Sequence, residues 1–145
     1  MRIQTKTFLP ALFSAVLMTV GAESMSAQIV NPIVAHINHS FSIGDVTLPP
    51  GQYTFQMLSG SDLSAMTVRS ADGNASDEFL VLTTEAPTTP KHSEVIFNRY
   101  GDHQFLTKIY EKGSRTGVQV VEPSREESRL QKQGQHPTEH AEEQQ

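Results

Sequence analysis

Apolar and polar residues alternate along much of the chain after residue 32, which is the pattern of β-strands that bury one face. The clearest example is residues 52–57, where Tyr53, Phe55 and Met57 share one face and glutamine or threonine occupies the other. Similar segments recur, with turn signals about every 8–12 residues. They cover residues 33–43, 65–70, 79–82, 94–100, 104–111 and 118–121. This spacing predicts an all-β fold.

One of these segments lacks the alternation. Residues 79–82 read Phe-Leu-Val-Leu and are apolar on both faces. Such a run is typical of a strand that is covered on both sides. We therefore predict a central strand at this position.

Turn-forming residues separate the predicted strands. Pro50 and Gly51 suit the central positions of a type II turn, because proline presets φ and glycine accepts a positive φ. Asp72 and Gly73 predict a hairpin connection, which also demands positive φ. The predicted structural turn residues are Pro49, Pro50, Gly51, Asp72, Gly73 and Gly101. Strands and turns together predict a single domain over residues 28–122, an antiparallel β-sandwich or small barrel of about seven strands.

The last part of the chain has a different character. Ser124 and Glu127 have the spacing of a capping box, which predicts a short helix within residues 123–133 that ends at Gly134. Residues 134–145 contain no large apolar side chain. A segment of this composition cannot bury enough apolar surface to fold, so we predict a disordered polar tail.

Residues 1–27 have the order of a secretory signal peptide. Two basic residues are followed by an uncharged, mostly apolar run over residues 8–20 and then by small residues. The run contains 13 residues, fewer than the ~20 that a membrane-spanning helix needs. We predict cleavage near Ala27, with Ala22 as the alternative, and a secreted or periplasmic protein without a membrane span.

Composition narrows the classes of function. The 145 residues include no cysteine, which excludes disulfides, zinc–thiolate sites, thiol nucleophiles and a lipid-modified cysteine anchor. The chain has 11 basic and 16 acidic residues, a net charge of −5, and no basic block. The electrostatic footprint of a nucleic-acid-binding protein is therefore missing.

Two segments carry a resemblance to a known family. Residues 41–53, FSIGDVTLPPGQY, resemble the F-x-(V/I)-G-x-x-x-L-P-A-G-x-Y signature of a family of small exported bacterial β-rich proteins without an assigned activity. Residues 95–106 are similar to its second signature, and Ser124 with Glu127 to its C-terminal S-x-x-E. Pro50 stands where the family usually has alanine. The resemblance implies a compact β-rich domain and no functional residues.

The six histidines raise the question of a metal site. His36 and His39 have H-x-x-H spacing, but residues three apart on a strand face opposite sides, so they are not expected to share an ion. His136 and His140 lie near acids in the predicted tail and would hold a transition metal only weakly. A solvated tail is the preferred interpretation, and we predict no metal site and no cofactor.

Catalytic residues are not predicted either. The chain lacks the G-x-S-x-G nucleophile elbow. A Ser–His–Asp set can be chosen from the sequence as Ser93, His92 and Asp102. Any chain with six histidines allows such a choice, so it is no evidence of a catalytic triad. A hydrolase would need His36, His92 and His103 gathered in one concavity.

We therefore expect an exported, non-enzymatic domain with a structural or interaction role. Its partner would be an envelope or extracellular protein or a small ligand, and the oligomeric state stays open. Tyr100 and Tyr110 are the candidates for exposed contacts, because both lie at strand ends flanked by polar residues. The alternative is a carrier of a small apolar or sugar ligand, since a small barrel can enclose one. A minor hydrolase is the third hypothesis.

Overall fold

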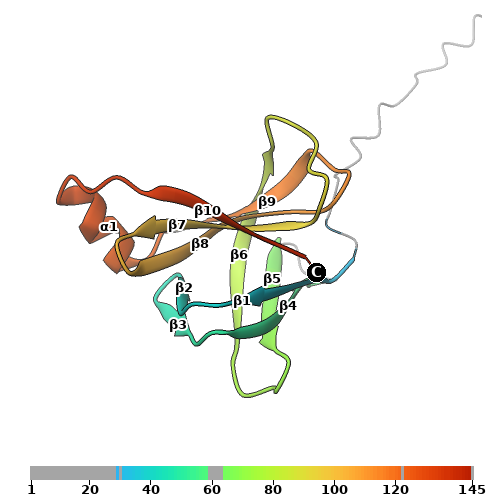
Figure 1. Ribbon diagram of the computed structural model, residues 1–145, viewed down its shortest axis with the longest axis horizontal. Coiled ribbons are helices and arrows are strands. Elements are labelled where there is room, and N and C mark those ends of the chain that lie inside the picture. The colour runs from blue at the N-terminus through green and yellow to red at the C-terminus, as the bar shows by residue number, and fades with distance from the viewer. Residues whose placement is uncertain (1–28, 30, 59–63, 122, 145) are drawn as a thin grey trace, which may run out of the picture.

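The computed structural model describes residues 29, 31–58, 64–121 and 123–144 (Figure 1). The predicted signal peptide, residues 1–27, lies outside these ranges, together with both candidate cleavage sites. Within the described ranges the chain is mostly β-structure with one short helix near its C-terminal end, which confirms the all-β prediction. No helix in these ranges is long and apolar enough to cross a membrane.

Among the described residues, ten strands form one sheet. They are β1 (Ile33–Ile37), β2 (Phe41–Ile43), β3 (Val46–Leu48), β4 (Gly51–Met57), β5 (Ala65–Ser70), β6 (Ser76–Glu85), β7 (Glu94–Tyr100), β8 (His103–Tyr110), β9 (Thr116–Val120) and β10 (Thr138–Glu143). The sequence predicts about seven. The number rises because the predicted strand over residues 33–43 divides into β1 and β2, and because β3 and β10 form where the sequence predicts none.

The strand order brings the two ends of the sheet together. The order runs β1-β4-β5-β6-β9-β8, after which β8 pairs with β7 and β7 with β10. These pairings are antiparallel, whereas β2 joins β8 through one parallel pair, Ser42 and Phe105, and β3 extends β2. Ala35 of β1 and Gln144, just after β10, form an isolated bridge. Figure 1 accordingly shows the C-terminal end lying beside β1.

The core lies on the inner face of the curved sheet, as the alternation predicts. Tyr53 and Phe55 of β4 are 1% and 0% exposed, whereas Gln52 and Gln56 on the other face of the strand are exposed. The ring of Phe41 stands edge-on to those of Tyr53 and Phe97, with centroids 5.1 and 5.4 Å away. Each large buried side chain contributes about 1.5–3 kcal/mol of transfer free energy. This stabilisation has to suffice, because the chain has no disulfide.

The glycine turns agree only in part with the prediction. Gly73 and Gly101 have φ of 75° and 59°, as the predicted hairpin turns require. Gly51 does not have a positive φ, so the predicted type II turn at Pro50 and Gly51 is wrong. The reason is register: Gly51 is the first residue of β4 and pairs with Ile37 at the end of β1, which demands an extended backbone.

The helix α1 (Arg125–Lys132) lies within the predicted range of residues 123–133. Its cap is the predicted one, since the Glu127 amide donates to Ser124 Oγ at 2.9 Å. Gly134, with φ of 78°, follows the helix end. Leu130 docks the helix on the sheet by packing with Tyr100 and Phe105.

Strand β10 lies in the segment for which composition favours disorder. Its six residues pair with β7, from Thr138 opposite Arg99 to Glu143 opposite Glu94. Five of the six side chains are exposed. The strand is held by backbone hydrogen bonds along the open edge of β7, and these need no apolar side chain. The amino-acid composition of residues 134–145 therefore gives no indication of strand β10.

Candidate functional site

The outward face of β6 is uncovered among the described residues. Phe79 and Val81 point into the core, whereas Leu80 and Leu82 are 47% and 60% exposed. The prediction of a strand covered on both sides is therefore wrong. Strand β6 has a hydrogen-bonded neighbour on each side, β5 and β9, but the curved sheet packs only its inner face. The apolar run over residues 79–82 therefore corresponds to a strand with an exposed apolar outer face.

Two more exposed apolar side chains adjoin Leu80. Val121 is 38% exposed, and its amide donates to the Leu80 carbonyl at 3.1 Å. Val46 is 42% exposed and, with Leu80 and Val121, lines a groove of about 320 Å³ between the β2–β3 turn and β6. We call Val46, Leu80, Leu82 and Val121 the outer apolar patch.

Acidic side chains border this groove. Asp45, Asp77 and Glu78 belong to its lining. Asp45 is paired with Arg125, whose Nε lies 2.8 Å from Oδ2. Asp77 and Glu78 have no ion-pair partner in the part of the chain that the structure describes. The groove therefore combines apolar walls with a negative edge.

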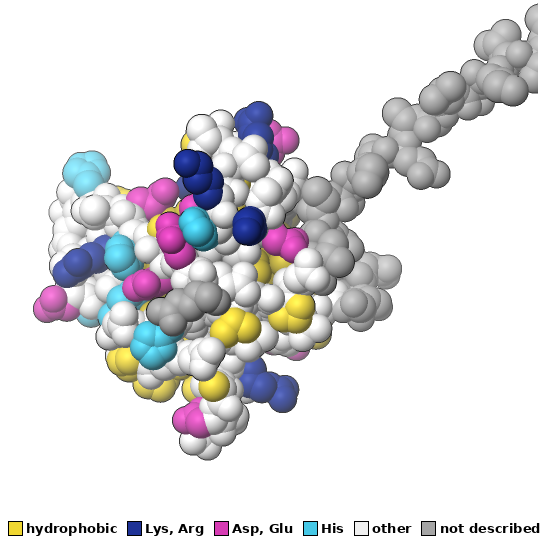
Figure 2. Space-filling view, turned by 45° about the vertical axis from the view of Figure 1, so that its right-hand side comes forward, with side chains coloured by type: hydrophobic (Ala, Val, Ile, Leu, Met, Phe, Trp, Pro, Cys, Tyr) yellow, Lys and Arg dark blue, Asp and Glu magenta, His cyan; other side chains and the backbone are white. Residues whose placement is uncertain are grey.

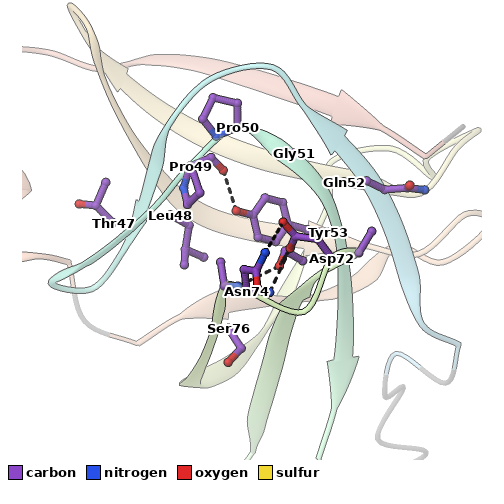
Figure 3. Close-up of a pocket in the computed structure, with 13 residues that line it drawn as sticks. Thr47, Leu48, Pro49, Pro50, Gly51, Gln52, Tyr53, Asp72, Asn74 and Ser76 are labelled. Carbon is purple, nitrogen blue, oxygen red and sulfur yellow. Dashed lines mark hydrogen bonds between the residues drawn. The ribbon is translucent and has the colours of Figure 1, made fainter.

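A larger, open hollow of about 610 Å³ lies between the predicted turn residues Pro49, Pro50 and Gly51 and the β5–β6 hairpin (Figure 3). Tyr53 stands at its floor and donates its hydroxyl hydrogen to the Pro49 carbonyl at 2.6 Å. Burial, and next the charge of Asp72, raise the pKa of Tyr53. The neutral hydroxyl thus ties the proline segment to β4.

The polar groups of this hollow are occupied within the hairpin. The Asp72 carboxylate accepts hydrogen bonds from Ser70 Oγ at 2.5 Å and from the amide and the side chain of Asn74, both at 3.0 Å. Ser70 Oγ in turn accepts from the Ala75 amide at 2.9 Å. The hydrogen bond from Ser70, followed by those from Asn74, holds the pKa of Asp72 below its usual range. This network stabilises a turn, so the hollow is a weaker ligand site than its size suggests.

Asp72→Asn is expected to destabilise the protein near pH 7 and to matter progressively less towards about pH 3. A carboxylate whose folded-state pKa lies below its unfolded value of about 3.9 contributes stability above that value and loses it as the pH falls through the folded pKa. Thermal unfolding followed by circular dichroism at pH 7 and pH 3 measures the difference in melting temperature between wild type and variant. Asp102→Asn, in another exposed turn, is the control. An equal gap at both pH values would contradict the prediction.

The two tyrosines predicted as exposed contacts are buried. Tyr100 is 2% exposed because Leu130 of α1 covers it, and its hydroxyl accepts from Gln131 Nε2 at 3.0 Å. Tyr110 is 4% exposed and packs against Ala86, in the loop between β6 and β7. The polar sequence neighbours point outward while the tyrosines face a helix and a loop that are distant in sequence. That prediction is wrong.

Among the described residues, the histidines weighed for hydrolysis do not belong to a converging group of ligand atoms. One group of three or more His, Asp or Glu side chains with converging ligand atoms exists among the described residues, and His36, His92 and His103 are not in it. Ser93 is 5% exposed, and its hydroxyl accepts from the Lys112 amide at 3.1 Å. The hydroxyl therefore holds a loop, which weakens the hydrolase hypothesis.

The one converging group contains His39, His140 and Glu142, whose ligand atoms all lie within 4.8 Å of one another. Nε2 of His39 is 3.5 Å and Nε2 of His140 is 3.1 Å from Glu142 Oε1. Desolvation by burial lowers the pKa of His39, which favours the neutral ring. Figure 2 shows histidines gathered among acidic side chains on one face. The sequence interpretation paired each histidine with near neighbours and missed this combination.

A comparison with protein-family models finds no match for this chain, and comparisons with curated proteins and with solved structures find none either. The family resemblance of residues 41–53 and 95–106 therefore stays a prediction. Function has to be argued from the surface and the side-chain chemistry described above.

Proposed function

We propose that the protein is an exported, non-enzymatic interaction domain that uses the outer apolar patch to bind a partner protein segment with apolar and basic side chains. The observation that carries this proposal is the exposed face of β6, where Leu80 and Leu82 are 47% and 60% exposed beside Val46 and Val121. Contiguous apolar surface on a soluble domain is typical of interaction sites. Export rests on the signal-peptide pattern of residues 1–27.

The acidic edge of the groove favours a basic partner. Asp77 and Glu78 border the same groove as Leu80. Lysine or arginine beside the apolar anchors of a partner would find the complementary charge there. Complementary charge of this kind adds specificity and speeds association, while apolar burial supplies most of the affinity.

A filled interior favours an interaction domain over a ligand carrier. We infer that the sheet closes as a small barrel, because Ala35 and Gln144 bridge the strands at its two ends. The side chains of Phe41, Tyr53, Phe55 and Phe97 occupy the interior and are each less than 2% exposed. Barrels of this size are filled by side chains or hold one small ligand. The packed rings support the first case.

The test uses peptides as probes. Synthetic peptides with two or three apolar residues and basic flanks are titrated into the ¹⁵N-labelled protein, and the same apolar peptides with acidic flanks serve as the charge control. The basic set is expected to shift the amide resonances of Leu80, Leu82 and Val121. Replacing both leucines with serine removes about 1.5–3 kcal/mol of burial each and should weaken binding at least tenfold. Gln56→Ser, exposed on β4, is the matched control.

Two results would overturn the proposal. One is that no peptide of either charge shifts the resonances of the outer apolar patch. The other is that the leucine variants bind as well as Gln56→Ser. Robust turnover of a common hydrolase substrate by the purified protein would overturn its non-enzymatic part.

A further inference from the structure

Pairing of β10 with β7 brings together three metal-ligating side chains from distant parts of the chain. His140 and Glu142 are two residues apart on β10, so their side chains leave the same face of the strand. His39 lies in the loop between β1 and β2, and its ring stands edge-on to Phe97 at a centroid distance of 5.3 Å. Phe97 is also the residue that pairs with His140 in β7. A buried core residue therefore sets the position of both histidines.

His39 is partly enclosed and one of its nitrogens is unsatisfied. Its side chain is 21% exposed, and Nε2 is buried with no hydrogen-bond partner among the described residues. Nδ1 lies 3.4 Å from the Ser40 carbonyl, to which it donates when it carries the proton. In that neutral tautomer Nε2 presents a lone pair to the Glu142 carboxylate, 3.5 Å away. A buried acceptor that faces an anion is unfavourable, and a cation between them removes the conflict.

We propose that His39, His140 and Glu142 bind one divalent transition-metal ion of the zinc type. Two imidazoles and one carboxylate are ligands that Zn²⁺ prefers, whereas Mg²⁺ and Ca²⁺ prefer oxygen ligands alone. The three ligand atoms already lie within 4.8 Å of one another, so small side-chain rotations bring them to a common ion at about 2.0–2.2 Å. Water completes the tetrahedron. The site is independent of the outer apolar patch.

The ion would act as a cross-link between β10 and the loop that follows β1. His140 and Glu142 belong to a strand with mostly exposed, polar side chains, whereas His39 belongs to the loop after β1. Besides backbone pairing with β7, β10 has an ion pair between Glu139 and Lys108 at 3.2 Å on the exposed surface, and exposed pairs contribute little. A metal that binds the folded state alone adds stability in proportion to the logarithm of its concentration.

Metal titration of the purified, chelator-treated protein tests the site. Zn²⁺ is followed by isothermal titration calorimetry and Co²⁺ by its visible absorption, which reports tetrahedral nitrogen and oxygen ligands; Mg²⁺ is the control ion. We expect one Zn²⁺ per chain and a higher melting temperature in its presence. Removing a residue that hydrogen-bonds to a metal ligand costs about 10–100-fold in metal affinity. His140→Ala and Glu142→Gln remove ligands themselves, so each should lower the affinity at least tenfold.

Matched histidine variants separate this site from non-specific binding. His136→Ala and His103→Ala remove exposed histidines outside the group and should leave the affinity for Zn²⁺ unchanged. His39→Gln tests the third ligand. If that variant does not fold, His140→Ala still tests the site, because the His140 side chain is 45% exposed. The proposal is overturned if the wild type binds no Zn²⁺. It is also overturned if His140→Ala binds as tightly as His136→Ala, because the bound ion would then not use His140 as a ligand.

Discussion

Replacing Gly117 with alanine is expected to lower the free energy of unfolding by about 3 kcal/mol. A Cβ at this position would collide with the ring of Tyr110 and with the carbonyl oxygen of Ile109, on the neighbouring strand β8. A backbone carbonyl within a ladder cannot rotate away, so β8 and β9 would have to separate. Gly117 is required by this close approach, and its φ is not positive.

Urea unfolding followed by far-ultraviolet circular dichroism measures this effect, since the chain has no tryptophan. Gly51→Ala is the matched control, because the nearest atom to its added Cβ is Tyr53 Cε2, at an ordinary contact distance of 3.5 Å. The control should change stability by less than about 1 kcal/mol. Equal stabilities of the two variants would show that β8 and β9 do not approach as closely as described.

Phe41→Ala is expected to cost about 3–5 kcal/mol, a large part of the total stability of a small domain. Phe41 is 1% exposed, and its ring contacts those of Tyr53 and Phe97. It thereby connects β2, which is attached to the main sheet by a single parallel pair, to β4 and β7. Truncation leaves a cavity between the two remaining rings and loosens that attachment.

The same urea experiment tests this prediction against a neighbouring position. Val46→Ala, on the paired strand β3, removes an exposed side chain and should shift the midpoint only slightly. Phe41→Leu should fall between the two and keeps the series measurable if the alanine variant does not fold. A Phe41→Ala protein as stable as Val46→Ala would mean that Phe41 is not part of the core.

These two sites differ in how far the sequence revealed them. Phe41 lies on the predicted inward face of an alternating segment, and its burial follows from local pattern. Gly117 ends the polar stretch of residues 112–117, which predicts a loop. No residue near it in the sequence indicates that the Tyr110 ring will pack against it. Alternation depends on residues two apart, whereas a close approach between strands depends on their register.

The sequence by itself determined the features that depend on near neighbours. The alternation at residues 52–57 determined which face of β4 is buried, and Ser124 with Glu127 determined the start of α1. Gly73 and Gly101 supplied the positive φ that their turns need. Each involves residues within about four positions of one another, over which strand and helix geometry is the same in any protein.

The tertiary structure alone decided which faces and edges meet. It left Leu82 exposed on a strand whose apolar run predicts cover, and it paired the polar strand β10 with the free edge of β7. That pairing also brought His140 and Glu142 to His39. Backbone hydrogen bonds form along a strand edge whatever the side chains are, so the register that unites these residues is absent from any local pattern.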